Sequence, residues 1–122
     1  MREIGKKGED LAEKLLKKNH YKIIERNFTI RGGEIDIIAK DKETLVFVEV
    51  KLRKNSDYGR PAEFVTPYKQ KKLIFTAQNY LAKTGGENSL CRFDVVELIG
   101  DKGKDGKLKI KEANIIKNAF MC

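Results

Sequence analysis

Two apolar runs on either side of a short polar segment constrain the fold of this chain most strongly. Residues 33–53 read G-E-I-D-I-I-A-K-D-K-E-T-L-V-F-V-E-V-K-L-R. Both runs are rich in Ile and Val, which favour β-strands. The polar segment Asp41–Thr44 between them is typical of a turn. The sequence therefore predicts a central β-hairpin over Gly33–Arg53.

Three charged residues interrupt the apolar pattern of this hairpin at related positions. Because side chains along a strand alternate between the two faces of a sheet, Glu49 and Lys51 share one face, about 7 Å apart along the strand. If the turn is centred between Lys42 and Glu43, residues whose numbers sum to 85 lie opposite each other. Asp36 is then the direct cross-strand neighbour of Glu49, with Cβ atoms roughly 5 Å apart.

This pairing predicts a metal site. Two like charges placed directly opposite destabilise a hairpin unless something lies between them. A divalent cation is the usual occupant, since Mg²⁺ takes oxygen ligands at about 2.0–2.1 Å. We expect Asp36 and Glu49 to share such an ion, with Lys51 within reach of a substrate bound to it. Glu34 lies on the same face as Asp36 and is expected to support the site from a greater distance.

The same residues carry a family resemblance. The spacing of Asp36, Glu49 and Lys51 resembles the active-site signature of the PD-(D/E)xK nuclease superfamily. The longer pattern, with G-E-I-D-I-I-A, F-V-E-V-K-L-R and later R-F-D-V-V, resembles the YraN-like family, which is related to archaeal Holliday-junction resolvases. The resemblance extends from about residue 5 to residue 120. It departs from the superfamily signature at Ile35, which stands where that signature has proline.

The resemblance implies a metal-dependent DNA endonuclease that hydrolyses phosphodiester bonds, on branched or junction DNA in repair or recombination. Asp36, Glu49 and the backbone carbonyl of Val50 would then hold one or two Mg²⁺ or Mn²⁺ ions, and Lys51 would act on the attacking water or the scissile phosphate. In similar nucleases a glutamate of the first helix completes the metal site, and Glu9 matches that position. From the residues alone, the favoured interpretation of Glu9 is an acid that suits the helix dipole near a helix start.

A basic balance points to a polyanionic partner. The chain has 26 Lys and Arg residues against 18 Asp and Glu, a net charge of +8, which suits DNA but also serves solubility alone. Lysines in the first turns of a helix oppose the helix dipole and so do not stabilise the helix. Together with the free backbone N–H groups at a helix N-terminus, however, they can bind phosphate. The predicted DNA contacts are Arg31, Arg53, Lys54, Arg60, Lys69, Gln70 and Lys72.

The remaining elements follow from periodicity and turn signals. We expect a helix over Gly5–Lys18 with Asn19 as its left-handed cap, a strand over Tyr21–Phe28, a loop over Lys54–Thr66, a helix from Pro67 to about Lys83, a strand over Leu90–Ile99, a short arm over Leu108–Lys111 and a docked tail over Ala113–Phe120. A helix between the third and fourth strands predicts a right-handed crossover between parallel neighbours. The 122 residues thus predict one α/β domain with a restriction-endonuclease-like core, a mixed sheet flanked by helices in the order α-β-β-β-α-β-β.

Several features limit the functional alternatives. Two cysteines form neither a disulfide framework nor a zinc site, and the single histidine, His20, is expected to be structural. No apolar run approaches the roughly 20 residues of a membrane span, and no signal peptide is evident, so a cytoplasmic protein is expected. Asp94 is expected to pair with Arg92 or a lysine rather than with the metal.

Two other functional classes remain open on the sequence alone. One is a DNA-binding module that has lost catalysis or awaits a partner, and the other is a protein-interaction module built on the nuclease scaffold. Junction cleavage needs two active sites, which would favour a homodimer. Val65, Phe75 and Phe120 are the candidates for its exposed apolar contact.

Overall fold

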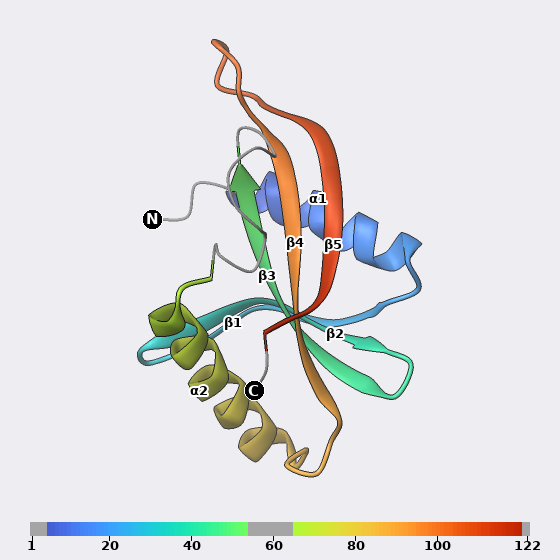
Figure 1. Ribbon diagram of the computed structural model, residues 1–122, viewed down its shortest axis with the longest axis vertical. Helices are drawn as coiled ribbons and strands as arrows, with labels where there is room; N and C mark the ends of the chain where they lie inside the picture. Colours follow the sequence, from blue (N-terminus) through green and yellow to red (C-terminus); the bar gives the residue numbers. More distant parts are fainter. Residues whose placement is uncertain (1–4, 54–64, 121–122) are drawn as a thin grey trace.

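A single five-stranded sheet runs through the molecule, and the computed structural model describes residues 5–53 and 65–120 of it. The elements are α1 (Gly5–Lys18), β1 (Lys22–Ile30), β2 (Gly33–Asp41), β3 (Thr44–Arg53), α2 (Pro67–Thr84), β4 (Cys91–Lys102) and β5 (Leu108–Phe120). The strand order is β1-β2-β3-β4-β5 (Figure 1), with β3 and β4 parallel and the other neighbours antiparallel. The predicted α/β class, element order and mixed sheet are confirmed, and they are consistent with a restriction-endonuclease-like fold.

The central hairpin has the predicted register. The pairs between β2 and β3 run from Ile37 opposite Val48 to Asp41 opposite Thr44, and in each the residue numbers sum to 85. Lys42 makes the turn possible with a left-handed backbone, φ 57°. The ladder ends at Ile37, one residue before the predicted pair of Asp36 with Glu49.

The second helix begins and ends as its sequence predicts. Thr66 caps the N-terminus by accepting a hydrogen bond from the backbone N–H of Lys69 at 3.2 Å, and Pro67 occupies the first turn. Gly85 closes the other end in the left-handed region, φ 75°, where its N–H donates to the carbonyl of Leu81. These caps fix the direction of α2 and so the position of its first turn.

The first helix has the predicted bounds but a different cap. His20, not Asn19, adopts the left-handed backbone, φ 70°. The side chain of Asn19 instead donates to the carbonyl of Leu15 at 2.9 Å, and the N–H of His20 donates to the carbonyl of Lys17 at 3.0 Å. Both residues thus serve the last carbonyls of the helix, which agrees with the structural role expected for His20.

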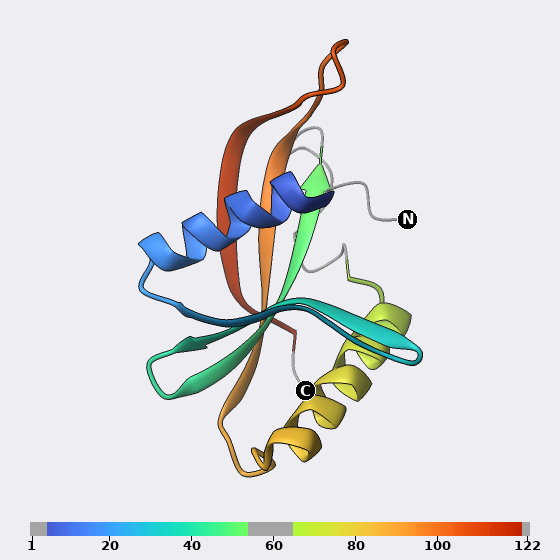
Figure 2. The same cartoon turned by 180° about the vertical axis from the view of Figure 1, so that it is seen from behind.

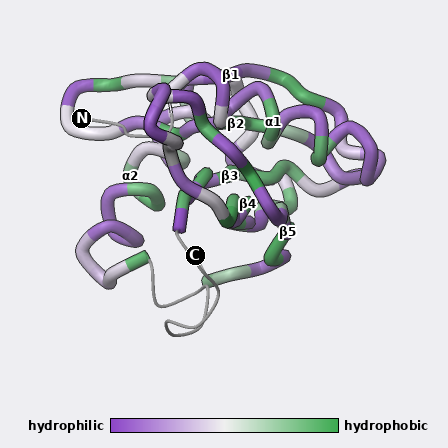
Figure 3. The backbone as a smooth tube through the Cα atoms, turned by 90° about the horizontal axis from the view of Figure 1, so that it is seen from above, coloured by the Kyte–Doolittle hydropathy of each residue, from purple (hydrophilic) through white to green (hydrophobic). Residues whose placement is uncertain are grey.

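Each helix covers one face of the sheet. One core cluster joins α2 residues such as Leu73 to Phe47 of β3, and the other joins Leu16 of α1 to Val48, the next residue of the same strand. Seen from behind, α1 crosses over β3, β4 and β5 (Figure 2). Both helices alternate hydrophilic and hydrophobic residues along the chain (Figure 3), as amphipathic helices that cover a sheet must.

The C-terminal segment corrects the sequence-based expectation. The structure has one strand of 13 residues, Leu108–Phe120, where a short arm and a docked tail were predicted. Between the pairs Phe93–Phe120 and Val95–Ile116 the register shifts, and Asn118 there adopts φ 53°. A bulge of this kind interrupts the alternation by which a strand is recognised.

Two of the three residues expected at a dimer contact are buried. Val65 belongs to the core cluster under α2, and the ring of Phe120 stacks on that of Phe93 with centroids 4.7 Å apart. Of these three residues, only Phe75 is exposed, at 51%.

Over residues 5–53 and 65–120, neither helix is long and apolar enough to cross a membrane.

Candidate metal and nucleic-acid site

The carboxyl groups of Asp36 and Glu49 meet on the α2 side of the sheet. Both residues are buried, since only 1% of Asp36 and 5% of Glu49 is exposed to solvent. Their side chains are hydrogen-bonded to each other. Asp36 Oδ2 also accepts the backbone N–H of Val50 at 2.7 Å. Because the β2–β3 ladder ends at Ile37, this carboxylate takes the place of a strand carbonyl as the acceptor. The backbone therefore fixes Asp36 and brings Glu49 against it.

The electrostatics of the pair are unfavourable for two negative charges. Burial, and then the hydrogen bond and charge of Asp36, raise the pKa of Glu49 to about 8, while Lys69 and Lys51 act in the opposite direction. Glu49 Oε2 is buried and accepts no hydrogen bond from any described residue. Lys69 Nζ lies 3.5 Å from this oxygen. At neutral pH the pair therefore retains a proton unless another cation replaces it.

These features suit a divalent cation. Two adjacent carboxyls supply hard oxygen ligands, and Glu49 Oε2 is a buried acceptor for which the described residues provide no hydrogen bond. The described residues gather no group of three or more Asp, Glu, His or Cys side chains arranged to hold a metal. Among the described residues, Asp36 and Glu49 are thus the two predicted side-chain ligands that lie together.

Glu9 pairs with an arginine of β1. It is buried on α1, and the first turn of this helix contains no acid. Its Oε1 accepts a hydrogen bond from Arg26 Nη2 at 3.2 Å. The same guanidinium binds Asp10 at 2.6 Å and Glu13 at 3.3 Å. Glu9 therefore belongs to an ion-pair cluster of α1 with β1, and its role as a metal ligand stays a prediction.

Two lysines flank the carboxyl pair. Lys51 is half-buried on β3 and close enough to Glu49 to oppose the rise of its pKa. Lys69 comes from the first turn of α2 and reaches Glu49 across the gap between the helix and the sheet. The capping of α2 by Thr66 thus positions a cation at the site.

The other predicted DNA contacts differ in their surroundings. Arg53 has only 10% of its side chain exposed, and its Nη1 donates to Glu97 Oε2 at 2.9 Å. Gln70 Nε2 donates to the carbonyl of Val65 at 2.8 Å. Arg31 is exposed in the turn between β1 and β2. Lys54 and Arg60 lie outside the described residues.

A cavity that the sequence did not predict lies between the β1–β2 turn and α2. It has a volume of about 350 Å³, and its walls include Thr29, Gly32, Gly33, Glu34, Lys69 and Lys72. Gly33 allows the turn to approach the helix, because a Cβ at that position would lie 2.0 Å from Thr76 Oγ1. The glycine pair in the sequence was the only available signal for this close approach.

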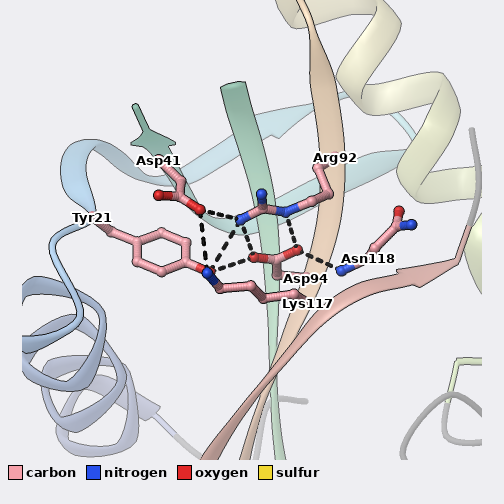
Figure 4. A network of polar contacts seen from close by, with 6 residues as sticks. All are labelled: Tyr21, Asp41, Arg92, Asp94, Lys117 and Asn118. Atoms are coloured by element: carbon pink, nitrogen blue, oxygen red, sulfur yellow. Dashed lines mark hydrogen bonds and ion pairs between the residues drawn. The ribbon is translucent and has the colours of Figure 1, made fainter. Parts of the chain in front are cut away.

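Asp94 belongs to a separate polar network (Figure 4). Its carboxylate accepts hydrogen bonds from Tyr21 Oη at 2.7 Å, Arg92 Nε at 2.9 Å and the backbone N–H of Asn118 at 2.9 Å. Arg92 also pairs with Asp41 at 2.8 Å. Burial and Asp94 raise the pKa of Tyr21, which keeps its hydroxyl a donor. The expected ion pair of Asp94 with Arg92 is confirmed.

The fold and the site together define an α/β protein with a restriction-endonuclease-like core that holds two facing carboxyls and adjacent lysines on one side of its sheet. The model of Uncharacterised protein family UPF0102 matches residues 8–98. The chain therefore belongs to this family, which bears out the YraN-like resemblance.

Relatives from several bacteria are similar over nearly the whole chain. A UPF0102 protein of Symbiobacterium thermophilum is 48% identical over 98% of this chain and 97% of the relative. A UPF0102 protein of Prosthecochloris aestuarii is 47% identical over 97% and 93%, respectively. One of Caldicellulosiruptor saccharolyticus is 43% identical over 98% of both chains.

Proposed function

We propose that this protein is a metal-dependent DNA endonuclease that hydrolyses phosphodiester bonds, with branched or junction DNA as its substrate in repair or recombination. One observation supports the proposal most. Asp36 and Glu49 form a buried pair of carboxyls in direct contact, and one buried oxygen of Glu49 accepts no hydrogen bond from the described residues. The charges of Lys69 and Lys51 act on this pair. Such a pair is costly for stability, and divalent-cation chemistry gives it a use.

The chain's own groups would prepare the site. Asp36, Glu49 and the carbonyl of Val50 would hold Mg²⁺ or Mn²⁺, which when bound lowers the pKa of a water and offsets charge on the attacked phosphate. The N–H of Val50 fixes one carboxylate oxygen of Asp36. Glu49 would release its proton to solvent when the metal binds and would then be the second anionic ligand.

The two lysines would act on the substrate. Lys51 shares a strand face with Glu49, so its ammonium would orient the attacking water or pair with the scissile phosphate, whereas its neutral amine would accept a proton from that water. Lys69, 3.5 Å from Glu49 Oε2, would neutralise a phosphate that approaches from the α2 side. The family resemblance implies in-line attack that leaves a 5′-phosphate and a 3′-hydroxyl.

A four-way junction requires two coordinated cuts, so its cleavage would require two copies of the chain. The proposal therefore includes a homodimer for that substrate. Flaps and nicked duplexes need only one cut and would not require it.

One observation favours a second candidate, a DNA-binding or protein-interaction module without catalysis. Arg26 ties Glu9 to the cluster with Asp10 and Glu13, and the described residues form no group of three or more Asp, Glu, His or Cys side chains that could hold a metal ion. Tight, salt-sensitive binding to branched DNA without metal-dependent cutting would support a binding module. Absence of DNA binding near physiological salt would support the interaction module.

The deciding experiment is a cleavage assay on four-way, flapped, nicked and linear DNA with Mg²⁺, Mn²⁺ or a chelator. Wild type should cut at least one of the branched substrates when Mg²⁺ or Mn²⁺ is present, and none of them in chelator. Asp36→Asn and Lys51→Ala should each lose about 10²- to 10⁴-fold in rate. Lys104→Ala removes one charge from the β4–β5 turn and should cut normally. Equal activity in wild type, Asp36→Asn and Lys51→Ala would identify a contaminant and contradict the proposal.

A further inference from the structure

An exposed aromatic ring stands at the start of α2. Tyr68 is 70% exposed, and Lys72 Nζ lies 5.0 Å from its ring centroid. The other tyrosine of this helix, Tyr80, is buried and packs edge-on against Phe28. Tyr68 is therefore not part of the core beneath α2, and the ammonium of a lysine one turn away lies over its ring.

Two lysines connect this ring to the carboxyl pair. Lys69, the next residue after Tyr68, reaches Glu49 Oε2 at 3.5 Å and also lines the 350 Å³ cavity. Lys72 lines the same cavity and contacts the ring of Tyr68. The carboxyl pair, the cavity and the ring thus follow one another along the first two turns of α2.

The chemistry of this surface fits a nucleotide. The two lysines attract a phosphate, and an aromatic ring offers a flat face on which a base can stack whatever its sequence. In a continuous duplex the bases are paired and stacked on their neighbours. A protein ring beside the strand therefore stacks well only on a base that is unpaired.

We propose that Tyr68 and Lys72 form a subsite for one unpaired nucleotide of a DNA strand whose neighbouring phosphate lies at the Asp36–Glu49 pair. This inference rests on the proposed function and deepens it. It assigns to the site a substrate with a single-stranded segment, such as a flap or an open branch point, in preference to continuous duplex.

The test measures binding without cutting. Dissociation constants are determined by fluorescence anisotropy, in chelator, for a labelled single-stranded oligodeoxynucleotide and for a blunt duplex of the same length. Tyr68→Ala should weaken binding of the single strand about 5- to 150-fold and leave the duplex unchanged. Tyr68→Phe keeps the ring and should bind the single strand like wild type.

The matched control is Phe75→Ala. Phe75 is a second exposed aromatic on α2, 51% exposed and about 10 Å further along the helix, and its loss should not change either dissociation constant. The inference is overturned if Tyr68→Ala binds the single strand like wild type, if it loses both DNA forms equally, or if Phe75→Ala causes the same loss.

The two proposals fail separately. If wild type binds the single strand through Tyr68 but never cuts DNA with metal, the nuclease proposal fails and the subsite stands. If wild type cuts branched DNA while Tyr68→Ala binds and cuts as wild type does, the subsite is overturned alone. If wild type binds neither the single strand nor the duplex, the subsite is overturned, and the cleavage assay on branched DNA decides the nuclease proposal by itself.

Discussion

At the scale of single residues, two opposing effects act on the pKa of the Glu49 carboxyl. Burial and Asp36 raise it, and two lysines lower it. Its pKa rises from an ordinary 4.5 to about 8 in the folded protein. The protonated form is thus favoured by folding. The contribution of this group to the free energy of unfolding is fully present below pH 4.5 and is lost as the pH rises through 8.

We predict that the stability of the metal-free protein falls between these two pH values and that Glu49→Gln removes most of the fall. At the alkaline end, Glu49→Gln should be more stable than wild type by on the order of a few kcal/mol. Urea unfolding in chelator across this range measures the effect. Mg²⁺ should stabilise wild type at the alkaline end and leave Glu49→Gln unchanged. Parallel curves for the two proteins would contradict the raised pKa.

Arg92 supports a second prediction at this scale. Its guanidinium neutralises Asp94, which is fully buried, and also binds Asp41. Arg92→Leu leaves buried charge without its partner and should cost about 3–5 kcal/mol of unfolding free energy. Tyr21→Phe removes one donor to Asp94 and should cost about 1–2 kcal/mol. Arg31→Leu, at an exposed turn, is the control and should change stability by less than about 0.5 kcal/mol.

At the scale of elements, the sequence predicts what depends on neighbours in the chain. The β2–β3 register follows from one turn and two alternating runs, so it was predictable to the residue. The caps of α2 are likewise local. β5 was predicted only in part because its bulge at Asn118 depends on Asp94, 24 residues earlier, whose carboxylate accepts the freed N–H.

The candidate site likewise combines contacts within one hairpin, which the sequence predicts, with contacts between elements, which it does not. The contact of Asp36 with Glu49 lies within one hairpin and was predictable from alternation. The approach of Lys69 to Glu49 depends on how α2 packs on the sheet, and so do the walls of the cavity. The pairing of Glu9 with Arg26 joins α1 to β1. No spacing in the sequence reports such contacts between elements.

Gly33 tests the packing of the β1–β2 turn on α2. In Gly33→Ala the new methyl would lie 2.0 Å from Thr76 Oγ1, and relieving this overlap should cost about 1–3 kcal/mol. Thr76→Ala removes that oxygen, so the double variant should recover part of the loss. A double-mutant cycle by urea unfolding measures the coupling. Purely additive losses would show that the turn does not press on the helix.

At the scale of the whole molecule, the excess of basic residues matters by its position. The net charge is +8, and the α2 side carries the carboxyl pair, the cavity, Lys69 and Lys72. The β4–β5 ribbon extends away from this region, with α2 at the opposite end of the molecule (Figure 1). If DNA lies along α2, charges near this helix contact phosphates, and charges at the far end of the ribbon do not.

This arrangement predicts how DNA binding depends on salt. The logarithm of the association constant should fall linearly with the logarithm of salt concentration. Lys69→Gln and Lys72→Gln should each reduce the slope by about one, because each removes a phosphate contact. Lys104→Gln makes the same change of net charge in the turn between β4 and β5 and should leave the slope unchanged. Anisotropy titrations of branched DNA in chelator, at several salt concentrations, measure the three slopes. Equal changes for all three variants would mean that only net charge matters, and DNA would then not lie along α2.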